Sequence, residues 1–308
     1  MSTPASLHPI ARSRCLLVAL MLISVAPAGA SDPAVAVYVR AYNGYSRTRL
    51  PDNSYKPESY TFAEGGRHEG SMVDKSIDGL SFRNVALTIA GPLRKRGYVP
   101  SFDPKHTDFV IVVFWGTTSG SKGRHLEGQQ SVVDAMQDSR TAQDALQDAK
   151  IQGGGGPGSS ASNLNAEAKA ELDQALILNG LANRLRDDNN FDNAGILGYR
   201  ADVIKAREVP WLSQYRDAVA ELEEDRYFVV LKAYDYTWLV TKKNWKLMWE
   251  ARFSIPAQGN AFNERLAAMA ESASQYFGQD VRHLIRETVR EGRVTVGAPT
   301  VIETLPQR

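Results

Sequence analysis

The sequence has only one cysteine, Cys15, among its 308 residues. This cysteine lies at the start of a short apolar run that extends to Ala26. We expect this N-terminal segment to be removed after export, so that the mature chain has no thiol. Disulfides, a thiolate nucleophile and a zinc site built on cysteine are then excluded. A lipid anchor is excluded as well, because it would need a cysteine just after the cleavage site.

Long hydrophobic runs and an excess of charge of one sign are also missing. The run from Cys15 to Ala26 is well short of the roughly 20 apolar residues that a membrane-spanning helix needs. The formal net charge is +1, and it becomes −1 once Arg12 and Arg14 leave with residues 1–30. A near-neutral chain has no general attraction for nucleic acid or for an anionic membrane. We therefore expect no nucleic-acid partner, and no transmembrane segment after residues 1–30 are removed.

Residues 1–30 have the composition of a secretory signal peptide. Arg12 and Arg14 supply positive charge before the apolar run, and Ala28-Gly29-Ala30 has the small-x-small pattern that signal peptidases cut. We expect cleavage near Ala30 and a mature chain that begins at Ser31. The expected location is the periplasm or the extracellular medium.

The hydrophobic pattern predicts an α+β domain in two parts, over residues 31–116 and 226–296. The first part has alternating strand residues at 35–42, an unpatterned loop or arm at 43–75, helical spacing over 79–97 and an apolar strand at 108–115. The second part has a β-rich run at 227–240, an alternating strand at 245–255, a helix from about Ala261 and a further segment that reaches Arg290. The alternation at 245–255 predicts a strand with one wet face. Together these elements predict a small antiparallel or mixed sheet of about four strands, covered by helices.

Residues 117–225 predict a large helical insertion between the second and third strands of that sheet. A glycine-rich linker at 153–162 divides it. A stripe of leucines predicts a helix over 165–186, and shorter helices are expected over 199–207 and 210–224. The stripe consists of Leu172, Leu176, Leu178, Leu181 and Leu185. Residues 297–308 are expected to form a flexible tail.

Short motifs in both β-containing parts carry a resemblance to a known family. They are Leu93-Arg-Lys-Arg-Gly97-Tyr98 at the end of a helix, Asp108-Phe-Val-Ile-Val in a strand, and Leu247-Met-Trp249-Glu250 in a later strand. These parts resemble a family of exported bacterial proteins of unknown function, often described as lipoproteins, with a small α+β domain. The resemblance implies an envelope location and a shared fold, and it implies no catalytic residues. The large insertion and the absent anchor cysteine depart from that family's pattern.

Two segments partly match ligand-binding motifs, and each lacks an essential residue. Gly153 to Ser160 has the spacing of a phosphate loop without its lysine, so we expect a flexible linker there. Asp188, Asn190 and Asp192 occupy the first, third and fifth positions of a calcium loop, but Tyr199 stands where a bidentate glutamate should close the shell. We expect a polar loop that ends a helix, and the sequence leaves open whether it binds calcium.

No motif marks a catalytic, cofactor-binding or metal-ligating residue. The histidines form no helical pair and no His-Glu-x-x-His pattern, and no Gly-x-Ser-x-Gly turn is present. Our first hypothesis is therefore a non-catalytic binding or assembly module with an envelope protein or glycan as partner. The alternatives are an envelope hydrolase with an unrecognised site and a purely structural protein. A concave pocket with convergent ionisable groups would favour an enzyme, whereas an exposed aromatic patch would favour a binding module.

Expression of the chain with its own N-terminus in a bacterium with two membranes tests the export hypothesis. We expect the mass of the exported protein to correspond to a start at Ser31. Ala30→Leu should block cleavage, because it removes a small residue that the peptidase needs. Ala26→Leu, which leaves the small-x-small pattern intact, should be processed normally. Recovery of the uncleaved wild-type chain in the cytoplasm would contradict the hypothesis.

Overall fold

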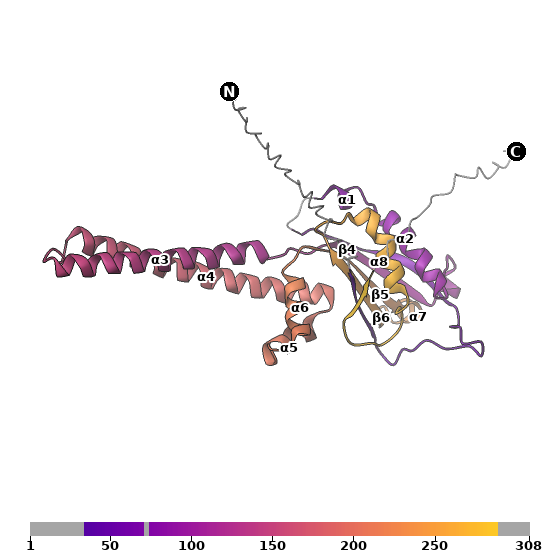
Figure 1. Ribbon diagram of the computed structural model, residues 1–308. Helices are drawn as coiled ribbons and strands as arrows, with labels where there is room; N and C mark the ends of the chain where they lie inside the picture. The colour runs from indigo at the N-terminus through magenta and orange to yellow at the C-terminus, as the bar shows by residue number, and fades with distance from the viewer. Residues whose placement is uncertain (1–33, 71–73, 289–308) are drawn as a thin grey trace, which may run out of the picture. The chain divides into compact units, whose positions relative to one another are not determined.

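The structure, a computed structural model, describes residues 34–70 and 74–288 (Figure 1). The expected signal peptide and the expected tail at 297–308 lie outside the described residues. The strands are β1 (Ala34–Ala41), β2 (Glu58–His68), β3 (Tyr98–Pro100), β4 (Phe109–Thr117), β5 (Arg226–Asp235), β6 (Leu247–Pro256) and β7 (Ile285–Thr288). The helices are α1 (Lys75–Asp78), α2 (Phe82–Lys95), α3 (Lys122–Ile151), α4 (Ser160–Leu197), α5 (Arg200–Glu208), α6 (Ser213–Leu222), α7 (Tyr236–Lys242) and α8 (Phe262–Ser274). None of the described helices has the length and apolar character needed to cross a bilayer.

The α+β prediction is confirmed, but the predicted size of the sheet is wrong. Within residues 34–70 and 74–288, the sheet has seven strands in the order β3-β2-β4-β5-β6-β1-β7. It is mixed, because β2 pairs in parallel with β3 and β4 while the other pairs are antiparallel. Strand β2 was not predicted and lies within the expected loop at 43–75. Only Tyr60 of this strand is fully buried, and two glycines interrupt the alternation of apolar and polar residues that marks a strand. The further segment expected to reach Arg290 contains the edge strand β7.

One face of the sheet packs against α2 and α8, which lie side by side (Figure 1). The apolar stripes of both helices point inward as their spacing predicts, and the core there is built around Trp249, Phe253 and Phe277. Trp249 and Phe277 stack with their ring centroids 5.9 Å apart. The central strand β4 is buried along almost its whole length, as its uniformly apolar sequence predicts.

The other face of the sheet is covered in part by the insertion. The prediction that one face of β6 is exposed to solvent is therefore wrong. Glu250 and Ser254 on that face are only 4% and 1% exposed. The C-terminal end of α4, together with α5 and α6, packs over Phe228 and Val230 of β5. The predicted strand at 227–240 is also too long. It ends at Asp235, whose side chain accepts a hydrogen bond from the N–H of Trp238 and caps α7.

Helices α3 and α4 run side by side and pack against each other (Figure 1). Their less exposed positions alternate at spacings of three and four residues, which is the spacing of a coiled-coil seam. In α3 these positions are Gly128, Val132, Ala135, Ser139, Ala142, Leu146 and Ala149, and in α4 they are Ala161, Asn165, Ala168, Leu172, Ala175, Asn179 and Ala182. The helix predicted over 165–186 is part of α4, but its leucine stripe is not the face that packs against α3. Only Leu172 lies in the seam, whereas Leu178, Leu181 and Leu185 are more than half exposed.

Widening this seam should destabilise the helix pair. Ala168 is 9% exposed, and Ala168→Ile places a larger side chain between helices that approach closely. Overpacking of this kind costs about 1–3 kcal/mol, which should appear as a lower urea midpoint in circular dichroism. Ala166→Ile, at an exposed position of the same helix, controls for the helix propensity of isoleucine. Equal losses in both variants would show that the seam is not tightly packed.

Candidate binding pocket on the sheet

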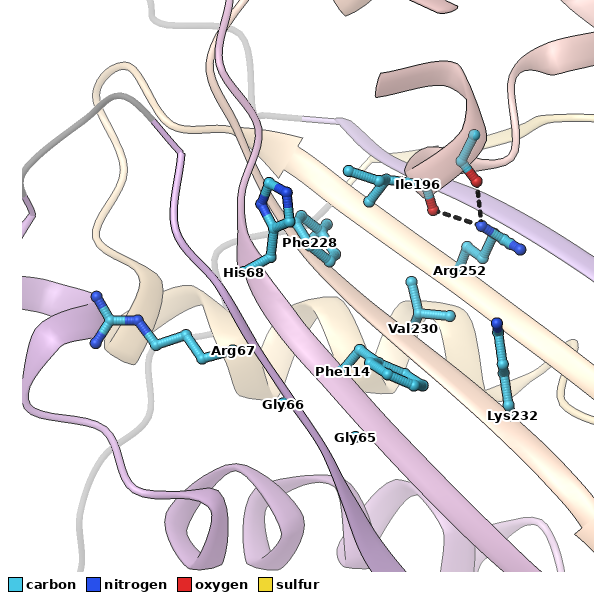
Figure 2. Close-up of a pocket in the computed structure, with 11 residues that line it drawn as sticks. Gly65, Gly66, Arg67, His68, Phe114, Ile196, Phe228, Val230, Lys232 and Arg252 are labelled. Atoms are coloured by element: carbon cyan, nitrogen blue, oxygen red, sulfur yellow. Dashed lines mark hydrogen bonds between the residues drawn. The ribbon is translucent and has the colours of Figure 1, made fainter. Parts of the chain in front are cut away.

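A pocket of about 390 Å³ opens on the face of the sheet that carries the insertion (Figure 2). Its lining comes from β2, β4, β5 and β6 and from the C-terminal end of α4. The lining residues are Gly65, Gly66, Arg67, His68, Phe114, Gly195, Ile196, Phe228, Val230, Lys232 and Arg252. We call this the sheet pocket.

The walls of the sheet pocket are apolar. Phe114 of β4 and Phe228 and Val230 of β5 stand on adjacent strands of the same face, and Ile196 of α4 closes one side (Figure 2). The opposite side is the backbone of β2, where the register shifts between Glu64 and Gly66. A Cβ on Gly65 would lie 2.6 Å from the Phe114 ring. Glycine at this position therefore keeps the aromatic wall in place and the pocket open.

Lys232 supplies an uncompensated positive charge to the sheet pocket. Its Nζ lies 5.4 Å from the centroid of the Phe114 ring, a cation–π contact. Glu250 is its register partner on β6, yet no described carboxylate lies within ion-pair distance of Lys232. Glu250 instead accepts hydrogen bonds from Arg252 Nη2 at 2.9 Å and from the Tyr42 hydroxyl at 2.7 Å. Burial and this hydrogen bond raise the pKa of Tyr42, which keeps the phenol protonated as the donor.

Arg252 attaches the insertion to the sheet. Its Nη1 donates to the carbonyl oxygens of Gly195 and Ile196 at 2.5 and 2.8 Å (Figure 2). A guanidinium at a helix C-terminus satisfies carbonyls that have no partner within the helix. The charge of Arg252 is thus already engaged by α4 and by Glu250, so Lys232 remains the cation available to a ligand.

The other two polar lining residues contribute less to the sheet pocket. Figure 2 shows that Arg67 points away from the walls, and its Nη2 pairs with Asp78 at 2.5 Å. The exposed ring of His68 has its Nδ1 3.0 Å from the carbonyl oxygen of Thr117. None of the lining residues carries a carboxylate, a hydroxyl or a thiol.

Neither the partial phosphate-loop motif nor the partial calcium-loop motif forms a binding site in the structure. The segment from Gly153 to Ser159 connects α3 to α4, and Ser159 caps α4 by accepting from the N–H of Ser162. Asp188, Asn190 and Asp192 lie inside α4, so the expected polar loop is wrong and a calcium loop is not formed. No group of three or more His, Cys, Asp or Glu side chains within the described residues could hold a metal ion.

The asparagines explain why α4 continues through this segment. Nδ2 of Asn189 and Nδ2 of Asn193 both donate to the carbonyl oxygen of Ser119, at 2.6 and 2.9 Å. Asn193 also donates to the carbonyl of Leu222 at 3.2 Å. Asparagine usually favours turns because its side chain competes for backbone groups. Here the side-chain amides of Asn189 and Asn193 instead form hydrogen bonds with backbone carbonyls of neighbouring segments, and α4 stays helical.

Four of the five tryptophans lie on or beside the strands β4, β5 and β6, and they fall into two classes. Trp115 and Trp249 are buried in the core, whereas Trp238 and Trp245 lie outside the strands and are 39% and 55% exposed. Trp245 packs edge-on against Tyr234 with centroids 4.8 Å apart. Lys246 Nζ lies 5.0 Å above the ring of Trp238. Trp238 and Trp245 thus keep part of their aromatic surface exposed, while Trp115 and Trp249 belong to the core.

No family model matches the chain, and no curated protein matches it.

Loss of the Arg252 contact should destabilise the protein strongly. Arg252→Met removes both carbonyl bonds and leaves Glu250, whose side chain is 5% exposed, without its cationic partner. Breaking a buried pair from one side costs about 3–5 kcal/mol, measurable by urea denaturation. The double variant with Glu250→Gln should recover part of the loss, because no unpaired charge remains buried. Arg83→Met, at an exposed position of α2 away from Glu250, should stay within about 0.5 kcal/mol of wild type.

Proposed function

We propose that this protein is an exported, non-catalytic binding module of the bacterial envelope. Its sheet pocket takes a small molecule that carries one carboxylate on an apolar body. The observation that carries this proposal is Lys232, a cation without an ion pair to a described carboxylate, held over the Phe114 ring in a pocket whose walls are mainly apolar. The export and envelope parts rest on the N-terminal pattern and on the family resemblance.

The size and composition of the sheet pocket support this ligand class. Small-molecule sites commonly measure about 300–1,000 Å³ and are mostly apolar, with a few polar groups that fix orientation. The walls formed by Phe114, Phe228 and Val230 would shield an aliphatic or aromatic body from water. Lys232 would pair with the carboxylate in surroundings of lower dielectric than water, where such a pair is stronger. A single compact cation suits a singly charged group better than a polyanion.

The alternative of an envelope hydrolase has less support. Acyl or glycosyl hydrolysis requires a nucleophile or an activated water next to a base. The Thr117 carbonyl lies 3.0 Å from Nδ1 of His68 and can orient the ring. The lining residues, however, offer no hydroxyl or thiol that His68 could activate as a nucleophile, and no carboxylate that could act beside it. Binding is therefore the function that this geometry supports best.

Octanoate is a suitable probe, with octanol as its uncharged counterpart. Binding is measured by isothermal titration calorimetry on the mature chain. Lys232→Met should weaken octanoate at least tenfold and leave octanol unchanged, because only the carboxylate uses the cation. Gly65→Ala should weaken both ligands, because the added methyl group displaces the Phe114 ring.

Lys56→Met serves as the matched control, since this exposed lysine has the same charge and is not a lining residue of the sheet pocket. It should bind both probes like wild type. Absence of octanoate binding to the wild type, or equal binding to wild type and Lys232→Met, would refute the proposal.

A further inference from the structure

A second pocket, of about 430 Å³, lies where the C-terminal ends of α2 and α8 meet the loop before β2. Four of its lining residues are cationic, namely Arg47, Arg94, Lys95 and Arg96, and none is acidic. We call this the basic pocket. It shares no lining residue with the sheet pocket.

Arg47 is a fixed and buried part of the basic pocket. Its side chain is 2% exposed, and its guanidinium lies between the rings of Tyr55 and Tyr98, 4.3 and 4.2 Å from their centroids. Nε pairs with Glu58 at 3.2 Å, and Nη1 donates to the carbonyl of Arg96 at 2.6 Å. Nη2 is buried, and no described residue forms a hydrogen bond with it. A buried guanidinium donor without a partner is costly in a stable fold unless another group satisfies it.

The local backbone is shaped to hold this arrangement. Gly97 and Gly278 have positive φ angles of 80° and 73°. A Cβ on Gly278 would collide with the Tyr98 hydroxyl and would lie 2.9 Å from Cδ of Arg47. The Gly97-Tyr98 motif of the sequence therefore serves to place Arg47 between its two aromatic rings.

The charges at the end of α2 are only partly compensated. Lys95 pairs with Glu271 at 3.0 Å, whereas Arg94 and Arg96 have no ion pair with a described carboxylate. Arg96 donates from Nε to the Ser274 hydroxyl at 3.4 Å. Basic residues at a helix C-terminus stabilise the helix through its dipole. The dipole accounts for their presence, but it does not account for a concave surface that also includes a buried guanidinium.

We propose that the basic pocket binds a phosphate group. Arginine presents several N–H donors in a planar fork that matches the oxygens of phosphate. Arg94 and Arg96 provide two such forks without a competing carboxylate. The phosphate could belong to a soluble compound or to a lipid headgroup, and the chemistry of recognition is the same in both cases.

Inorganic pyrophosphate and phospholipid vesicles distinguish these two sources. Titration calorimetry with pyrophosphate tests soluble phosphate, and co-sedimentation with phosphatidylglycerol vesicles, compared with phosphatidylcholine vesicles, tests an anionic headgroup. The double variant Arg94→Gln/Arg96→Gln should reduce binding at least tenfold in whichever assay the wild type is positive. Both arginines lie at the end of α2, and circular dichroism verifies that the helix content is kept.

Arg83→Gln is the control, because Arg83 is an exposed arginine in the first turn of the same helix and does not line the pocket. It should bind like wild type. The proposal is overturned if the wild type binds neither probe, if the double variant binds as well as wild type, or if Arg83→Gln reduces binding equally. Octanoate binding should be unaffected by these variants, so failure here leaves the proposal for the sheet pocket standing.

Discussion

The contact between Arg252 of β6 and the last carbonyls of α4 determines how the helical insertion is attached to the sheet. A long helix ends over a sheet strand, and its unpaired Gly195 and Ile196 carbonyls would otherwise be desolvated without partners. Arg252 satisfies them, and Glu250 balances the charge of Arg252. Because Glu250 is occupied in this way, it does not neutralise its cross-strand neighbour Lys232. The positive character of the sheet pocket is thus a by-product of how the insertion is anchored.

The two pockets differ in how they hold charge, and this difference separates their ligand classes. The sheet pocket combines a single ammonium with aromatic walls, an arrangement that rewards apolar area as much as charge. The basic pocket contains guanidinium groups and small polar side chains at its rim, such as Ser54 and Asn53. A ligand there would gain mainly from charge-assisted hydrogen bonds, and its affinity would fall with salt.

The main core could be predicted from the sequence, because α2 and α8 carry helical spacing and β4 is a short apolar run rich in β-branched and aromatic residues. Strand β2 and the full length of α4 could not be predicted, for reasons that the structure identifies. β2 has one buried residue and a bulge at Gly65-Gly66. α4 continues through an asparagine-rich segment because tertiary hydrogen bonds from Asn189 and Asn193 override local preference. The sheet pocket could not be predicted, since its lining comes from strands and a helix that are distant in sequence and meet only through the strand order.

The small-residue seam between α3 and α4 makes the length of this hairpin a modular quantity. The same kind of contact repeats every seven residues along both helices, and α3 makes its principal contacts with α4 alone. Removing one such repeat from each helix would bring the next equivalent pair of small residues into register, and it would leave the anchor at Gly195 and Ile196 untouched. Whole seven-residue repeats could therefore be added to or removed from both helices without altering the residues that line either pocket.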